Sequence, residues 1–356
     1  MPRRSTAKSI VIPPPTMGWN TMDPISNMGE EYAVDCTNCW SDGGTVDLRK
    51  GATVFRGLTG HPDYEQIFSF PLQTGHYRLV GVSSDGTPYD VSLIQPVSWT
   101  DLSSSGTKLI DFFANSVVFK NLLFIKGSIF IDGITDKDVY YWDGTSGSLT
   151  APGFSGPGGD DKALSSVQVY KNRLYFTGLD LSIWYGGIDQ ISGASPALTQ
   201  FNMQTVFKNG GKLLFAGGTQ KQGPNDQEYF VAISTTGETL LYQGDAPHLS
   251  TWSLVGHFYM PPPVGLKSFF YWGTDLVIIT VQGVLLLSQV LKGTSGYTFI
   301  SEKINNILIE YFKLSNDPHL TTGIFYPHAN MLLIHVHTGL LDVGAPPSGT
   351  FAMNTN

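Results

Sequence analysis

The chain has 356 residues, of which 14% are charged, and a net charge of −8. Its length suits one large β-domain or two ordinary domains, and its acidity argues against a protein that grips phosphate backbones through its overall field. The longest apolar run, residues 284–291, is too short to span a membrane, and the basic start at residues 1–8 lacks the apolar stretch of a signal peptide. We therefore expect a protein that folds in a cytoplasm and has no membrane span.

Turn-forming and aromatic residues are abundant, with 40 glycines, 16 tyrosines and 21 phenylalanines. This composition predicts an all-β fold of short strands joined by tight connections. The charged fraction is below the roughly 25% that is usual for soluble domains. Two explanations remain open: copies or partners cover much of the surface, or Ser, Thr, Asn and Gly supply its polarity.

Residues 1–30 show no regular hydrophobic period. Pro13-Pro14-Pro15 favours polyproline II, and Asp23-Pro24 favours a turn. We predict an extended N-terminal arm over residues 1–30, followed by a β-body over residues 31–356.

Both cysteines of the chain, Cys36 and Cys39, have the spacing C-x-x-C. A structural zinc site needs four ligands, and no histidine lies at a suitable spacing from this pair. A redox pair would begin a helix, whereas here Trp40 and a Ser-Asp-Gly-Gly turn follow. We predict two reduced, structural thiols; a metal contact completed from elsewhere and a redox role are the alternatives.

A short unit recurs after residue 51. It reads Asn or Gly, any residue, Leu, an apolar residue, then Phe or Ile, and in several copies a second, aromatic strand follows. Its central leucines are Leu79, Leu122, Leu174, Leu213, Leu276 and Leu332. The steps resemble the roughly 40–50 residues of propeller blades but are irregular. The pattern predicts a β-propeller-like body with inserted loops, which also allows for an inserted subdomain; a tandem of β-sandwiches is the alternative.

One short helix is predicted over residues 302–313, because Ile304, Ile307, Leu308, Tyr311 and Phe312 follow the helical period. It would pack one face on the β-body. Residues 351–356 suggest the first strand of a blade hairpin whose partner is absent, so we expect an incomplete last blade.

No catalytic constellation stands out, and we expect no enzyme, no cofactor and no metal. Asp111, Asp180 and Glu228 are carboxylates that a glycan hydrolase could use, but the sequence does not place them together. His335 and His337 would share one face of a strand without a third ligand, so a surface or subunit contact is the stronger interpretation.

Three stretches resemble a tail-protein family of short-tailed phages. They are Gly18–Met28 with the following residues 33–51, then residues 252–288, and finally residues 351–355. Their order along the chain is more specific than any one motif. The family is that of the tail nozzle, also called tail tubular protein B or packaged-DNA stabilisation (tail hub) protein. The positions that match its motifs are Gly18, Asn20, Asp23, Pro24, Asn38, Trp40, Arg49, Gly51, Asp275, Thr280 and Gly283.

The resemblance implies a structural virion protein that forms a homohexameric ring around the DNA exit channel. Its partners would be further copies, a tail adaptor or other tail proteins and fibres, and the genome, which passes without sequence-specific binding. The protein would be located in the virion tail after assembly in the host cytoplasm. The lumen of its ring would carry few Lys or Arg residues, and residues 9–30 would dock on an adjacent subunit or ring. The alternatives are a receptor- or glycan-binding propeller and, less favoured, a glycan hydrolase.

Overall fold

The computed structural model describes residues 13–42, 44–49, 64–83, 86–92, 100–103, 115–126, 139–155, 164–178, 180–193, 197–220, 228–293, 296–315, 320–336 and 349–354. This part of the chain is nearly all β, as predicted. A short hairpin of β1 (Cys39–Asp42) and β2 (Thr45–Leu48) comes first. Six antiparallel sheets then follow in chain order, and each is formed by consecutive strands.

The first three sheets contain the strands β3 (Tyr64–Pro71), β4 (Tyr77–Ser83), β5 (Pro88–Asp90) and β6 (Thr100–Asp101); β7 (Asn115–Phe119), β8 (Leu122–Lys126) and β9 (Val139–Trp142); and β10 (Leu164–Tyr170), β11 (Arg173–Gly178), β12 (Ser182–Tyr185) and β13 (Thr199–Asn202). The last three contain β14 (Leu213–Gln220), β15 (Glu228–Ser234), β16 (Glu238–Gln243) and β17 (Ser253–Tyr259); β18 (Phe269–Trp272), β19 (Asp275–Thr280) and β20 (Gly283–Leu286); and β21 (Thr322–Tyr326), β22 (Met331–Val336) and β23 (Gly349–Asn354).

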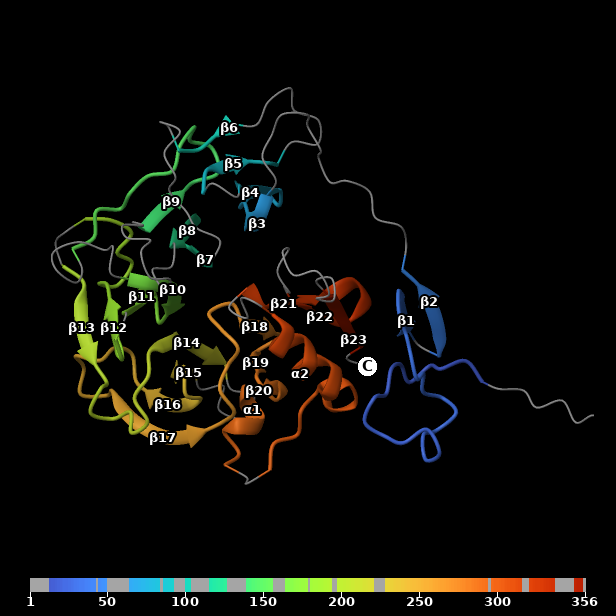
Figure 1. Cartoon of the computed structure of the whole chain (residues 1–356). Helices are drawn as coiled ribbons and strands as arrows, with labels where there is room; N and C mark the ends of the chain where they lie inside the picture. Colours follow the sequence, from blue (N-terminus) through green and yellow to red (C-terminus); the bar gives the residue numbers. More distant parts are fainter. Residues whose placement is uncertain are drawn as a thin grey trace, which may run out of the picture.

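The six sheets follow one another around an arc, with the first strand of each sheet turned toward the inside (Figure 1). The first strands start 51, 49, 49, 56 and 53 residues apart, which is more regular than the leucine repeat suggested. Five of the six leucines lie on second strands, but Leu213 begins the first strand β14. The equivalent second strand, β15, carries no leucine, which explains the error.

Five hydrophobic clusters hold the sheets together, one between each consecutive pair. Side chains alternate between the two faces of a strand, so the second strand of each of the four middle sheets contributes to two clusters. On β15, Phe230 and Ala232 pack toward the third sheet, whereas Val231 and Ile233 pack toward the fifth. This stacking of small sheets by their faces is the β-propeller-like architecture expected from the sequence.

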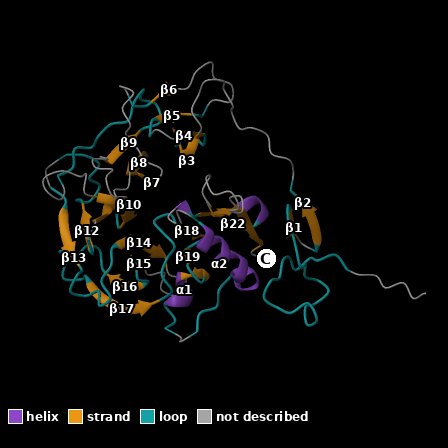
Figure 2. Cartoon of the chain, viewed as in Figure 1, coloured by secondary structure: helices purple, strands orange, loops and turns teal. Residues whose placement is uncertain are grey.

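Helices lie beside the last two sheets (Figure 2). The predicted helix is confirmed as the short 3-10 helix η2 (Glu302–Ile304) followed by α2 (Asn305–Leu314). Ile304, Leu308 and Phe312 form its buried face in the cluster between the fifth and sixth sheets. The one-turn helix α1 (Leu287–Val290) was not predicted, and a further 3-10 turn, η4 (Pro327–Ala329), joins β21 to β22. Among the described residues, no helix has the length and apolarity needed to cross a membrane.

The outward faces of the first and last sheets carry exposed apolar side chains. Ile67 is 48% exposed and Ile324 is 63% exposed, and each lies opposite the face that packs on the neighbouring sheet. The strand expected to lack a partner, β23, pairs with β22 over six residue pairs and is the third strand of its sheet rather than the first. The β1–β2 hairpin lies beside β23.

Candidate functional site

The three stretches that carry the family resemblance meet in one hydrophobic cluster. Trp19 from the first stretch packs against a cluster that contains Val277, Ile279 and Val284 from the second stretch and Phe351 from the third. More than 250 residues of chain separate Trp19 from Val277. Each of the three stretches therefore contributes to one packed region of the protein.

The N-terminal arm is fastened to its own chain. The buried Asn20 side chain accepts hydrogen bonds from the backbone N–H groups of Met22 and Asp23 and donates one to the Asp23 carboxylate at 2.7 Å. Asp23 pairs with Lys303 at 2.8 Å, and the Thr21 backbone N–H donates to the Lys303 carbonyl at 2.8 Å. Hydrogen bonding to Lys303 and Asn20 lowers the pKa of Asp23. The described part of the arm, residues 13–30, thus contacts η2 of its own chain, and the docking of residues 9–30 on another subunit stays a prediction.

The remaining positions of the first stretch shape turns. Gly18 has a φ of 80°, and the Pro24 carbonyl accepts the N–H of Asn27 at 2.8 Å. Asn38 adopts a φ of 58° just before β1, and its carbonyl accepts the N–H of Arg49 at 2.8 Å, which closes the hairpin. Trp40 pairs with Asp47 inside that hairpin. Gly51 lies outside the described residues.

Both cysteines are free thiols, as predicted. The Cys36 thiol donates to the Cys39 carbonyl at 3.6 Å. Burial, with a contribution from Cys39, raises the pKa of Cys36 to about 12. Such a thiol stays protonated near neutral pH and is a poor nucleophile.

The second stretch closes the β19–β20 hairpin. Asp275 accepts hydrogen bonds from the backbone N–H groups of Leu276 at 2.9 Å and Ser288 at 3.1 Å, and so connects β19 to α1. The buried Thr280 hydroxyl donates to the Gly283 carbonyl at 2.7 Å. Gly283 has a φ of 140°, and a Cβ at this position would lie 2.5 Å from Asn305 Oδ1. Only glycine allows this close approach between the hairpin and α2.

The carboxylates considered for hydrolysis have separate partners. Asp180 accepts hydrogen bonds from Ser182 and Gln204, whereas Glu228 pairs with Lys171. Asp111 and His337 lie outside the described residues, and His335 contacts the Thr350 hydroxyl at 3.0 Å. Among the described residues, no three His, Cys, Asp or Glu side chains gather in a way that could hold a metal ion.

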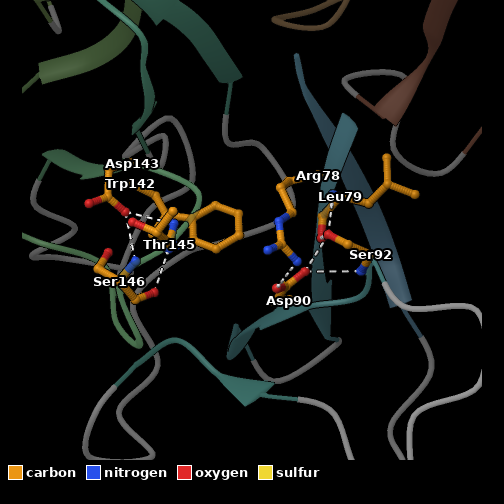
Figure 3. A network of polar contacts seen from close by, with 8 residues as sticks. All are labelled: Arg78, Leu79, Asp90, Ser92, Trp142, Asp143, Thr145 and Ser146. Carbon is orange, nitrogen blue, oxygen red and sulfur yellow. Dashed lines mark hydrogen bonds and ion pairs between the residues drawn. The ribbon is translucent and has the colours of Figure 1, made fainter. Parts of the chain in front are cut away.

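Other polar networks also fix loops. In the first sheet Asp90 pairs with Arg78 at 3.4 Å and binds Ser92, and in the second sheet Asp143 accepts the backbone N–H groups of Thr145 and Ser146 (Figure 3). These two backbone hydrogen bonds, that from Ser146 first, lower the pKa of Asp143 to about 2. The Asp143 side chain therefore fixes the loop that follows β9.

A cavity of about 280 Å³ lies where the third, fourth and fifth sheets approach one another. Its lining comes from β10, β14, β15, β18 and the β18–β19 turn, and consists of Val169, Gly218, Glu228, Tyr271, Gly273 and Thr274. The first strands β10, β14 and β18 lie near one another on the inside of the arc (Figure 1). The cavity therefore sits toward the inside of the propeller-like body.

Polar groups of different kinds face this cavity. The Tyr271 hydroxyl donates to the Gly218 carbonyl at 2.6 Å. Thr274 Oγ1 is buried and has no hydrogen-bond partner within the described part of the chain. Glu228 Oε2 pairs with Lys171 Nζ at 3.2 Å, while a Cβ built on Gly218 would lie 2.8 Å from Glu228 Oε1. Glycine at position 218 is what allows the carboxylate to lie over the strand.

From the sequence, Glu228 was considered as a carboxylate of a glycan hydrolase, whereas the cavity residues Lys171, Tyr271 and Thr274 were not predicted. One signal was present: of the three Lys-Asn dipeptides in the chain, those at 120–121 and 171–172 directly precede a buried strand. Both pairs adopt positive φ, at 50° and 59° and at 46° and 56°. Each turn lysine forms an ion pair with an acid of the next sheet, Lys120 with Asp189 and Lys171 with Glu228.

No family model and no curated protein matches the chain. Among solved structures, the chain is similar to the WD40 β-propeller domain of Doa1, with 12% identity, coverage of 85% of this chain and 86% of that chain, and a TM-score of 0.42. It is also similar to BBS1N, solved in complex with ARL6DN and soaked with lead, with 10% identity and a TM-score of 0.38. That match covers 63% of this chain and 65% of the BBS1N chain, which is less than two thirds of its length.

The described sheets define an all-β protein of β-propeller-like architecture. At these identities and TM-scores, the solved structures add nothing about what the protein binds.

Proposed function

We propose that the protein is a non-enzymatic structural component of a phage tail, which forms a ring around the DNA exit channel. The supporting observation is the convergence of the three family-like stretches in one cluster, with Trp19, Val277 and Phe351 as representatives. The matched polar residues stabilise turns and contacts between elements, as a scaffold requires.

The acidity of the chain is compatible with this role. A conduit for DNA should not grip phosphates, and a net charge of −8 per copy disfavours such binding. In the ring, the lumen would carry few Lys or Arg residues. The partners would be further copies of the chain, other tail proteins and the passing genome.

The mass of the native assembly tests this proposal. Native mass spectrometry of the full chain over a range of concentrations should reveal a complex of about six copies, and electron microscopy should reveal rings. A protein that remains monomeric at every concentration would contradict the ring. Rings lined by basic side chains would contradict the passive conduit but not the assembly.

A receptor-binding propeller is the second candidate. The observation in its favour is the cavity beside Glu228, Tyr271 and Thr274, which has an unpartnered hydroxyl among the described residues. Binding to a panel of glycans and proteins, measured on the monomer and on any assembly, distinguishes this candidate from the first. A monomer that binds a receptor would favour it.

A further inference from the structure

The cavity between the third, fourth and fifth sheets presents a carboxylate and an aromatic ring together. Glu228 and Tyr271 line it from neighbouring sheets, and Thr274 adds a buried hydroxyl. A carboxylate and a hydroxyl oxygen can accept hydrogen bonds from an ammonium or a guanidinium group, and an aromatic face attracts the same cations. These three groups have the chemistry of a cation site.

Lys171 shows that an alkylammonium group fits this carboxylate. Its Nζ lies 3.2 Å from Glu228 Oε2 and 5.8 Å from the centre of the Tyr170 ring. The other oxygen, Oε1, lies over Gly218, which lines the cavity. One side of the carboxylate therefore faces Lys171, and the other side faces the cavity.

The cavity can be reached from solvent. Tyr271 is 43% exposed, and the side chains of Lys171 and Glu228 are 38% and 31% exposed. Both Tyr271 and Glu228 are therefore accessible to a ligand that enters the cavity. Burial raises the pKa of Tyr271 to about 12, and the negative charge of Glu228 adds to this effect.

We propose that this cavity binds a basic side chain, lysine or arginine, of a protein partner. The aliphatic part of that side chain packs against Val169 and Tyr271, and its charged end binds Glu228 Oε1 and Thr274 Oγ1. Lys171 competes for the same carboxylate and so weakens the interaction. This proposal is independent of the tail ring: the ring is tested by the mass of the assembly, and the cavity is tested by ligand binding.

The test uses the full chain with small probes. Nα-acetyl-lysine methylamide and its arginine equivalent are titrated, with the norleucine compound as a neutral analogue of lysine. NMR chemical shifts of the Gly218, Gly273 and Thr274 amides report binding. We expect saturable shifts with both basic probes, with a dissociation constant on the order of 1 mM, and none with norleucine. Equal binding of norleucine would overturn the proposal.

Three variants make the test specific. Glu228→Gln should weaken binding about 10-fold, because it removes a charged hydrogen-bond acceptor, and Thr274→Val should weaken it to a smaller extent. Lys171→Ala should strengthen it, because the competing ammonium is gone. Asp189→Asn is the matched control: it breaks the equivalent ion pair with Lys120 one sheet earlier, outside the cavity, and should leave binding unchanged.

The sign of the Lys171→Ala effect also separates cations from anions. If inorganic phosphate shifts the same amides and Lys171→Ala abolishes that shift, the site binds an anion such as a nucleic-acid backbone, and the proposal is wrong. Binding of the basic probes that survives Glu228→Gln at full strength also overturns it. Thermal unfolding of each variant confirms that the fold is retained.

Discussion

The Lys171 ammonium lies 3.2 Å from the Glu228 carboxylate across the interface between the third and fourth sheets, although Lys171 itself has a φ of 46°. Left-handed backbone is unfavourable for most residues other than Gly, Asn and Asp. The two central residues of the tight β10–β11 turn must both adopt it, because this turn follows the right-handed twist of the strands. Lys120 and Asp189 repeat the relationship one sheet earlier at 2.7 Å.

The turn geometry gives the first prediction. Asn172→Val should lower the free energy of unfolding by about 1–3 kcal/mol, because a β-branched residue is strained at this φ of 56°. Asn172→Gly should be nearly neutral, because glycine adopts this conformation without a steric penalty. Urea denaturation of both variants measures the difference. Equal midpoints would contradict the proposed role of backbone strain.

The Lys171–Glu228 ion pair itself should contribute little. Both side chains are about one third exposed, so a double-mutant cycle should give a coupling energy of at most about 1 kcal/mol. The coupling should shrink in 1 M salt. A double-mutant cycle of Lys120 and Asp189 is the control and should give a similarly small, salt-dependent coupling energy. A larger, salt-insensitive coupling would mean that water is excluded from the pair.

A buried carboxylate predicts the pH dependence of stability. Glu238 accepts the backbone N–H groups of Lys208 at 2.7 Å and Asn209 at 2.8 Å and contacts His257 Nε2 at 2.6 Å. Burial favours the neutral form, but these hydrogen bonds outweigh burial and hold the pKa of Glu238 below its ordinary value. Its contribution to stability is therefore fully present above the ordinary pKa of 4.5 and is lost as the pH falls through the lowered pKa of the folded state.

Substitution of Glu238 checks this linkage. Glu238→Ala leaves two N–H groups and His257 without their acceptor and should lower the free energy of unfolding by about 3 kcal/mol at pH 7. Urea denaturation from pH 7 to pH 3 should show a shallower acid dependence in Glu238→Gln than in the native protein. Identical acid dependence in both would contradict the assignment.

Close packing of the β19–β20 hairpin on α2 predicts a large effect at one glycine. Gly283→Ala should lower the free energy of unfolding by about 2 kcal/mol or more, because the new Cβ would lie 2.5 Å from Asn305 Oδ1. Gly273→Ala is the matched control, since its φ is 60° but its Cβ would meet open space; it should cost only about 1 kcal/mol. Asn305→Ala should partly rescue Gly283→Ala. Equal losses at the two glycines would argue against the clash.

The arm contact can be tested without assembly. Asn20→Ala removes the acceptor of the Met22 and Asp23 amides, so hydrogen exchange at these amides and at Thr21 should accelerate. Lys303→Met removes the ion pair with Asp23 but keeps the backbone contact to Thr21, and its effect should be smaller and salt-dependent. Unchanged exchange in Asn20→Ala would mean that the arm is held elsewhere.

The periodicity of apolar residues predicted those helices and strands that bury only one face. The helix at residues 302–313 was visible because Ile304, Leu308 and Phe312 repeat at four-residue steps and reach one cluster. The sheets were visible as a repeat, but the repeat placed Leu213 on a second strand, whereas it begins the first strand β14. Both β14 and β15 are buried on two faces, so neither shows the alternation that would mark the first and second strands.

The candidate cavity could not be predicted, because its residues come from three sheets and none carries a catalytic motif. Glu228 was considered only as one of a pair of acids, and its partner turned out to be a lysine that sits in a strained turn. The family-like stretches were found in sequence, but that Trp19 and Phe351 share a cluster depends on long-range packing. Position in three dimensions, and not residue type, defines both the cavity and the cluster that Trp19 and Phe351 share.

The second strands of the middle sheets, which pack on both faces, have an evolutionary consequence. Loss or gain of a single residue within β15 would exchange the faces on which Phe230 and Ala232, and Val231 and Ile233, lie. It would therefore disrupt the hydrophobic clusters on both sides of the fourth sheet at once. Changes of length should therefore accumulate in the connections and spare the strands. Reporter tags and inserted peptides belong in those connections as well.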